Sequence, residues 1–422
     1  MKTKRYLPIA LLALVCSRQL SFAQPTLETG SQKPMPNEWI DKDTHHKVVK
    51  LTRLPGSSLS FYFTNDPFVG NKMVFYNSSL QKGGEESERV RKPQPGSNIA
   101  NKQMFLLDLK TLQSEQLTNS PSPMNGEIVN AKLKMAYFQI KDSVYSINTS
   151  TKEQKLLFVF PADYKGSIST VNADGTLLAG AKASDEQKQI LKDHPVKSEY
   201  FQLIFNAHLP NDLFTINTKT GELKKLLTEN TWLGHVQFSP IDPKLLMFCH
   251  EGPWEKVDRI WTIDVNTLEK KLMHKRTMDN EIAGHEWWGT DGKTIWFDLQ
   301  MPKGQTFFIG GNDIATGTEK KWEMQRDEWS IHFNTYNNGQ LFCGDGGDPG
   351  QVAKAKNGEW IYLFHPDGDK LSSEKLVNMK NHNYKLEPNV HFSPDGKWII
   401  FRANFEGTEN VYAAEIAKSS EW

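Results

Sequence analysis

The stretch between residues 235 and 288 combines polar and aromatic side chains in a way that indicates chemistry. It contains the segments HVQFSP, FCHEGPW, VDRIW and GHEWW, each at or near the end of an apolar, strand-like run. A chain that needed only a core would have apolar residues at these places. Imidazole, guanidinium and carboxylate groups at strand ends are typical of the lining of a site.

Histidine and arginine residues in this stretch are suited to proton transfer and to anion binding. His285, in GHEWW, is the candidate base, because a neutral imidazole in a partly buried, aromatic site accepts a proton near neutral pH. Arg259 has two interpretations: it pairs with Asp258, or its planar fork binds a carboxylate. His250 ends a strand and is expected to face the same pocket. Arg276 precedes the His285 strand in a short loop and is suited to an anion.

Other aromatic and imidazole side chains have two interpretations each. Trp287 either stacks on a sugar face or packs in the core. His235 and His391 each precede a motif of a turn followed by a strand, and His332 holds a similar place. Either each histidine only caps its own strand, or the three converge on one axial pocket.

The segment LEPNVHF is a candidate for metal binding. Glu387, Asn389 and His391 alternate along it, and residues at i, i+2 and i+4 of a strand share one face. Together with His332 they offer four potential metal ligands. The alternative is a polar strand end that is closed by hydrogen bonds.

Two alternating patterns predict the scaffold that positions these residues. An outer hairpin recurs at 104–118, 144–158, 213–227 and 260–273, and a turn followed by a strand recurs between these copies. Hairpin pairs repeated about every 50 residues indicate an all-β fold, the β-propeller. Seven blades are expected, with six and eight as the alternatives. A long insertion near 185–211 begins with a predicted helix and is expected to project beside the site.

Composition and the N-terminus define the class of protein. The 422 residues contain 50 Lys+Arg and 50 Asp+Glu, so no basic excess points to a nucleic-acid partner. Residues 1–23 have the pattern of a signal peptide, which predicts export to the periplasm, with a lipoprotein at Cys16 or full secretion as alternatives. Residues 24–45 are expected to be a linker and 46–420 the propeller. No later apolar run has the length of a transmembrane segment.

Two cysteines follow the signal peptide, and each ends a strand-like run. Cys249 and Cys343 are interpreted as small buried hydrophobic residues. A disulfide in an oxidising compartment is the alternative.

Five segments in a fixed order resemble the oligogalacturonate lyase family of polysaccharide lyases. They are WLGH (232–235), FCHEGPW (248–254), VDRIW (257–261), GHEWW (284–288) and the His332 segment that runs into GDG (344–346). The resemblance covers most of the chain after the signal peptide and is strongest from residue 212 onward. It implies a seven-bladed propeller that cleaves short uronate oligosaccharides derived from pectin by β-elimination.

The resemblance also implies roles for individual residues. The catalytic histidine of the family falls on His285 and its catalytic-site arginine on Arg259. Removing the C5 proton of a uronate requires a base and a group that neutralises the neighbouring carboxylate. The side chains expected to bind substrate are His235, His250, Arg276 and Trp287.

The metal site is where the sequence departs from the family pattern. The family binds a divalent, manganese-like metal, and its first ligand falls on His332. The family's glutamine falls on Tyr384, and its two further histidines fall on Glu387 and Asn389. Either a changed set that includes Glu387, Asn389 and His391 binds the metal, or the metal is absent.

The sequence is therefore compatible with three functions. The first is a lyase for oligogalacturonides, and the second is a lyase for another uronate-containing glycan on the same fold. The third is a non-catalytic propeller that binds glycans or proteins in the periplasm. The expected partner in the first two is an acidic oligosaccharide, and the sequence predicts no oligomeric state.

Overall fold

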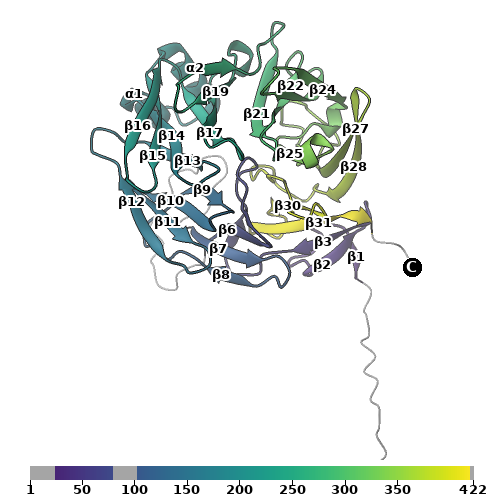
Figure 1. Cartoon of the computed structure of the whole chain (residues 1–422). Coiled ribbons are helices and arrows are strands. Elements are labelled where there is room, and N and C mark those ends of the chain that lie inside the picture. The colour runs from purple at the N-terminus through teal and green to yellow at the C-terminus, as the bar shows by residue number, and fades with distance from the viewer. Residues whose placement is uncertain (1–23, 79–101, 419–422) are drawn as a thin grey trace, which may run out of the picture.

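The computed structural model of the protein describes residues 24–78 and 102–418, so the predicted signal peptide, 1–23, lies outside the described residues. Antiparallel sheets follow one another around a ring, and the chain begins and ends in the same sheet (Figure 1). The all-β propeller predicted from the sequence is confirmed. Among the described residues, no helix combines the length and apolarity needed to cross a membrane.

Three consecutive sheets have four strands each, in simple up-and-down order. The first holds β9 (Asn125–Asn130), β10 (Met135–Ile140), β11 (Ser143–Asn148) and β12 (Gln154–Val159). The second holds β13 (Ser167–Val171), β14 (Leu177–Ala183), β15 (Asn211–Asn217) and β16 (Leu223–Glu229). The third holds β17 (Leu233–Phe238), β18 (Leu245–His250), β19 (Ile260–Asp264) and β20 (Lys270–Leu272).

An eight-stranded sheet follows, and it consists of two four-stranded antiparallel halves. One half holds β21 (Ile282–Trp288), β22 (Thr294–Gln300), β23 (Phe307–Asp313) and β24 (Glu319–Met324). The other holds β25 (Phe333–Tyr336), β26 (Leu341–Gly344), β27 (Trp360–Asp367) and β28 (Lys370–Asn378). A single parallel bridge between Glu323 and Lys370 joins them.

The two remaining sheets hold the ends of the described chain. One contains β4 (Ser57–Leu59), β5 (Phe68–Val69), β6 (Lys72–Ser78), β7 (Gln103–Asp108) and β8 (Ser114–Gln116). The other contains β1 (Thr26–Leu27), β2 (Glu38–Asp41), β3 (His46–Lys50), β29 (His391–Phe392), β30 (Trp398–Ala403) and β31 (Asn410–Lys418). The ring closes because β3 pairs with β31. Residues 24–45, expected as a linker, instead provide β1 and β2 of this closing sheet.

The outer hairpins form for a local reason that repeats along the chain. An Asp or Asn at each turn accepts hydrogen bonds from the backbone amides two and three residues later. A residue with positive φ then completes the turn four positions after the Asp or Asn. The turn residues are Asp108, Asn148, Asn217, Asp264 and Asp313. The predicted hairpins at 104–118, 144–158, 213–227 and 260–273 are thereby confirmed.

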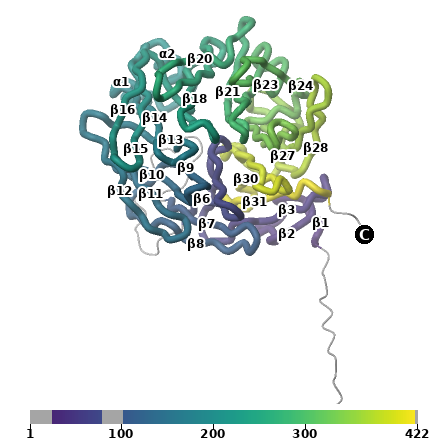
Figure 2. Tube along the Cα trace, in the orientation of Figure 1, coloured from purple at the N-terminus to yellow at the C-terminus, as the bar shows by residue number. Residues whose placement is uncertain are grey.

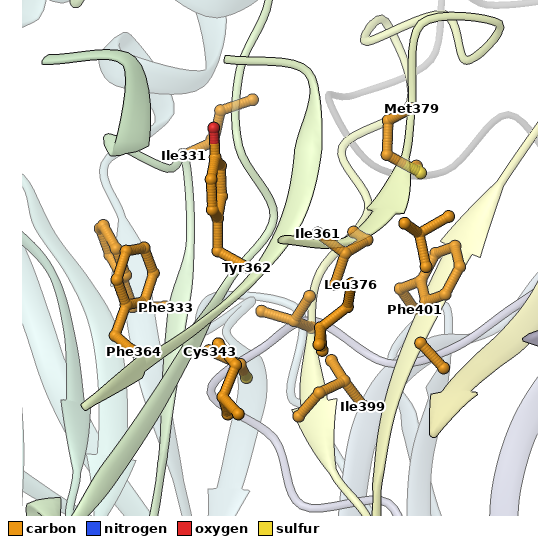
Figure 3. Packing of buried hydrophobic residues seen from close by; sticks show 14 of the residues in the cluster. Ile331, Phe333, Cys343, Ile361, Tyr362, Phe364, Leu376, Met379, Ile399 and Phe401 are labelled. Atoms are coloured by element: carbon orange, nitrogen blue, oxygen red, sulfur yellow. The ribbon is translucent and has the colours of Figure 1, made fainter. Parts of the chain in front are cut away.

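Apolar side chains fill the space between neighbouring sheets. Figure 3 shows part of the largest cluster, in which the rings of Phe333 and Phe364 pack together at 6.0 Å, and Ile361 and Leu376 lie between them and Phe401. Cys343 and the second cysteine, Cys249, are both buried and unpaired, which confirms the prediction of small core residues and excludes the disulfide. Burial also raises the pKa of both thiols.

The insertion between β14 and β15 forms two helices. The predicted helix is α1 (Asp185–Asp193), and Ser184 caps its N-terminus through a bond from the Gln187 amide. The second, α2 (Lys197–Ala207), was not predicted. Figures 1 and 2 show both helices at the rim of the ring.

Candidate active site

Two histidines stand at equivalent irregularities of β17 and β21. The β17–β18 and β21–β22 ladders both shift register at a Gly-His pair. His235 has φ of 46° and His285 has φ of 47°, which turns both side chains out of the regular pleat. Glycine is required before His285, because a Cβ on Gly284 would lie 2.4 Å from the Trp254 ring. In the GHEWW segment, Gly284 thus allows Trp254 to pack closely, and His285 lies in the bulge of β21.

A segment from a distant part of the sequence completes the centre of the site. The residues between β4 and β5 reach the middle of the ring (Figure 1). The Tyr62 ring lies 6.2 Å from the His235 ring and 5.2 Å from the His332 ring. The Phe63 ring lies 4.6 Å from His332 and 6.2 Å from His285. The structure therefore brings His235, His285 and His332 around one pair of aromatic rings.

His285 has the surroundings of a neutral imidazole. Its ring lies 4.9 Å from the Trp254 ring and 5.0 Å from the His332 ring. The residue is partly exposed, while its Nδ1 is buried without a hydrogen-bond partner among the described residues. Nε2 is consequently the nitrogen that a ligand can reach. Burial, followed by the nearby charges of His332, His235 and Arg259, holds the pKa of His285 well below its usual value of 6.5.

Arg259 is fully occupied by two buried carboxylates. Its Nη1 and Nη2 donate to the two oxygens of Glu251 at 2.7 and 3.0 Å, and its Nε donates to Glu286 at 2.9 Å. The guanidinium also lies 4.6 Å from the Trp254 ring and is 1% exposed. The pairing with Asp258 is wrong, because Arg259 pairs with these glutamates instead. Its fork does bind a carboxylate, that of Glu251.

His235 joins the same group of charges, which we call the Arg259 cluster: Arg259, Glu251, Glu286 and His235. Its Nε2 lies 3.3 Å from Glu251 Oε1 and its Nδ1 lies 3.6 Å from Glu286 Oε1. Burial alone would raise the pKa of Glu251, but the Arg259 charge and the His235 hydrogen bond hold that pKa well below its usual range. Arg259 and Glu251 thus form a buried ion pair, and Glu286 and His235 contact it.

A buried aspartate orients His332. The Nδ1 of His332 lies 2.9 Å from Asp345 Oδ2, and the backbone amide of His332 donates to Asp345 Oδ1 at 2.8 Å. Its Nε2 faces Glu387, with a separation of 3.7 Å from Oε2. A carboxylate on one imidazole nitrogen is the arrangement seen behind metal-binding histidines. His332 and Glu387 are therefore brought together as predicted, with Nε2 as the nitrogen turned toward the carboxylate.

The other two predicted metal ligands do not join them. Asn389 uses its Oδ1 to accept the Phe63 amide at 3.0 Å and its Nδ2 to donate to the Glu387 carbonyl at 3.0 Å. His391 directs Nε2 to the Asn65 carbonyl at 3.2 Å. The predicted strand alternation is wrong here, because only His391–Phe392 is strand and Asn389 has φ of 53°.

The donor set that remains does not fit a resident metal ion. Of the four predicted ligands, His332 and Glu387 alone face each other, through Nε2 and a partly exposed carboxylate. In the part of the chain that the structure describes, no group of three or more His, Cys, Asp or Glu residues is placed to hold a metal ion. The changed ligand set considered from the sequence is not assembled.

Two further predicted substrate-binding residues, His250 and Arg276, have partners in other parts of the structure. His250 Nε2 lies 2.7 Å from Glu229 Oε2, and the ring stacks on Trp261 at 5.1 Å. Arg276 donates to Asp258 at 3.1 Å and to the Glu255 carbonyl. It thereby braces the short helix η1 (Trp254–Lys256), which carries the tryptophan over His285 and Arg259.

Trp287 belongs to the core. It is 2% exposed, and its ring packs edge-on against Phe63 at 6.2 Å. The core interpretation of this residue is confirmed, and no face of the ring is open to a sugar.

Several residues of the site did not stand out in the sequence. These residues do not recur at the positions of the sequence repeat that the histidines occupy. Each lies in a loop or directly follows a residue that was already a candidate. A signal existed only for Glu286, which follows His285 directly, and for Asp345, which lies inside the GDG segment at 344–346. The residues are Tyr62, Phe63, Trp254, Glu286 and Asp345.

Comparisons with known proteins found relatives that share one family description. A model of the family described as oligogalacturonate lyase matches residues 94–420. The oligogalacturonide lyase of Pectobacterium atrosepticum is 26% identical over 335 residues, which cover 75% of this chain and 83% of that protein. The oligogalacturonate lyase of Dickeya dadantii is 28% identical over the same length, with the same shares covered.

Two solved structures share the fold. An oligogalacturonate lyase in complex with manganese has a TM-score of 0.74 and 23% identity, and the match covers 90% of this chain and 96% of that chain. An oligogalacturonate lyase from Vibrio parahaemolyticus has a TM-score of 0.74 and 22% identity, over 91% and 97% of the two chains. With the family model matching well over half of its residues, this chain belongs to the oligogalacturonate lyase family of polysaccharide lyases.

Proposed function

We propose that the protein cleaves short oligogalacturonides by β-elimination, with His285 as the base that removes the C5 proton. The single observation that carries this assignment is the state of His285, a neutral imidazole with a reachable Nε2 between Trp254 and His332. The substrates in the names of its bacterial relatives support oligogalacturonides as the class.

The elimination breaks two bonds and forms one double bond. His285 Nε2 takes the C5 proton, the electrons form the C4–C5 double bond, and the C4–O bond breaks. The leaving oxygen takes a proton from solvent, and the protonated His285 returns its proton to solvent. The product then carries an unsaturated uronate at its new non-reducing end. Arg259 contributes as a positioning residue, because its contacts hold Glu251 and Glu286, and both glutamates in turn contact His235. We derive no step through a metal, since the donors present do not fit one.

The N-terminal residues support export to the periplasm. Lys2, Lys4 and Arg5 precede an apolar run, and Ser21 and Ala23 supply small residues for cleavage before residue 24. N-terminal sequencing of the protein from a periplasmic extract tests this proposal. A chain that starts at Gln24 is the expected result, and an uncleaved N-terminus in the cytoplasmic fraction contradicts it.

The function is tested by following the ultraviolet absorbance of the conjugated unsaturated uronate. We expect digalacturonate and trigalacturonate to give the signal, and His285→Ala to lose about 100-fold or more in kcat. His365→Ala is a matched control, because His365 is exposed on β27. Wild-type protein that gives no signal with either oligomer, with or without added divalent metal, refutes the proposal.

A second candidate keeps the base and changes the substrate. The observation that favours it is the replaced segment at Glu387 and Asn389, which lies against His332 and Phe63. A panel of other uronate-containing glycans, assayed by the same absorbance, separates the two candidates. Turnover of one of them at a higher kcat/KM than any oligogalacturonide selects the second.

A further inference from the structure

The helical insertion lies beside the candidate active site. Phe205 of α2 packs against Gly252, where an added Cβ would lie 2.8 Å from the phenylalanine ring. Lys256 of η1 donates to Gln202 of α2 at 3.4 Å. Ile204 of α2 is 2% exposed, so this helix is packed against the rest of the protein. The insertion thus has a fixed position next to the loop that carries Trp254.

Three aromatic side chains meet between α2 and the start of β17. The Phe201 ring lies 5.2 Å from the Trp232 ring, and the Tyr200 ring lies 6.1 Å from it. All three side chains are partly exposed. The Trp232 carbonyl accepts the Glu251 amide at 2.8 Å, which connects this aromatic group directly to the Arg259 cluster.

A lysine adds positive charge to the same place. Lys197 Nζ lies 5.1 Å from the centre of the Phe201 ring. The residue is exposed, and within residues 24–78 and 102–418 no ion pair occupies its ammonium group. Its charge is also among those that lower the pKa of His285, after burial and the nearer His332, His235 and Arg259. Lys197 is thus close enough to the base to be felt electrostatically.

We propose that the surface formed by Lys197, Tyr200, Phe201 and Trp232, here called the helical rim, binds an additional uronate unit of the substrate. Aromatic faces stack on the C–H face of a pyranose ring, and an unpaired ammonium pairs with the carboxylate of that ring. This subsite adjoins the unit that is cleaved at His285. The inference rests on the proposed function and extends it to a preference for chain length.

The experiment compares kcat/KM for di-, tri- and tetragalacturonate. The wild-type protein is expected to favour the longer substrates. Lys197→Ala and Trp232→Ala should each lower kcat/KM on the longer substrates by roughly three- to tenfold and leave the dimer within about twofold. Lys197→Arg should restore most of the loss, because it keeps the charge. Lys192→Ala is the matched control, since Lys192 is an exposed lysine of the neighbouring helix α1.

The outcomes separate the two proposals. If the wild-type protein cleaves the substrates and Lys197→Ala and Trp232→Ala show the same dependence on chain length, the subsite at the helical rim is refuted. The proposed function is unaffected by that result. An equal loss on dimer and tetramer refutes the subsite as well, because the residues then act at the cleaved unit or on the fold. Lys197 is exposed, so its variant keeps the test valid if Trp232→Ala does not fold. Absence of cleavage by the wild-type protein overturns the proposed function itself.

Discussion

Arg259 holds both carboxylate oxygens of Glu251 through its two terminal nitrogens, at 2.7 and 3.0 Å. Its third nitrogen position, Nε, is taken by Glu286 at 2.9 Å. An arginine in a uronate lyase invites the interpretation that it grips the substrate carboxylate. Here the guanidinium is 1% exposed and its strong acceptors are already in place. The energetic role of Arg259 is therefore to compensate two buried negative charges.

Replacing Arg259 should destabilise the whole protein. Arg259→Met leaves Glu251 and Glu286 buried without their partner, and breaking such a pair costs about 3–5 kcal/mol. The free energy of unfolding from denaturant titration measures the loss. Arg276→Ala is the control, because its partly exposed bridge to Asp258 should contribute about 1 kcal/mol or less. An Arg259→Met protein that is as stable as wild type but inactive would instead indicate direct substrate contact.

The acid limb of the pH–rate profile should lie below pH 6.5. The active form of His285 is the neutral imidazole, and its pKa is held well below the ordinary 6.5 by burial and by neighbouring charges. Activity should stay level as the pH falls through 6.5 and decline only as the lowered pKa is approached. The kcat/KM of oligogalacturonide cleavage across pH 4–8 measures this. A limb centred at or above pH 7 contradicts the assignment of the base.

The stability of the fold should depend on pH through His382. Its Nε2 lies 2.7 Å from the Leu386 carbonyl and its Nδ1 accepts the Asn404 amide at 3.3 Å, so the ring is neutral. Burial lowers its pKa from 6.5 to about 4. In the unfolded chain His382 is protonated below pH 6.5, whereas in the folded protein it is protonated only below about pH 4.

The stability advantage of wild type over His382→Gln should therefore be full above pH 6.5 and shrink as the pH falls toward 4. The expected change over this window is about 3 kcal/mol. Denaturant titrations of both proteins at several pH values give the difference directly. A difference that is constant with pH shows that His382 does not titrate in this way.

Trp287→Phe should affect stability and leave substrate affinity alone. The ring is buried against Phe63, and its Nε1 is buried without a hydrogen-bond partner among the described residues. The smaller phenylalanine leaves a cavity, which costs stability, but it also removes that unsatisfied donor, so the net loss should be about 1–3 kcal/mol. KM for oligogalacturonides should change by less than about twofold. A tenfold rise in KM with unchanged stability would show that the ring stacks on a sugar.

Chelation should leave the protein intact. Of the predicted metal ligands, His332 and Glu387 are the two that face each other. The side-chain amide of Asn389 is hydrogen-bonded to the backbone of Phe63 and Glu387. Dialysis against a chelator should change neither the melting temperature nor kcat, and elemental analysis should find less than one bound metal per chain. A rise in melting temperature of several degrees on adding manganese to chelated protein contradicts this, because ligand binding stabilises a fold.

The local features of this protein were predictable from the sequence because they depend on neighbours along the chain. The outer hairpins follow from one Asp or Asn at each turn, as at Asp108 and Asn217, and from strand alternation on either side. The α1 helix begins at the capping Ser184, and its bounds match the predicted range. Residue types that do proton chemistry, above all His285, are also visible in the sequence alone.

Only the tertiary structure decided which groups are free to act. Arg259 is neutralised by Glu251 and Glu286, Trp287 is buried, and the positive φ of Asn389 breaks the predicted alternation along its segment. These outcomes depend on the desolvation of charges and on packing between sheets that lie far apart in the sequence. Periodicity gives the direction of a side chain from its own strand, whereas the partner that it meets is set by the closing of the ring.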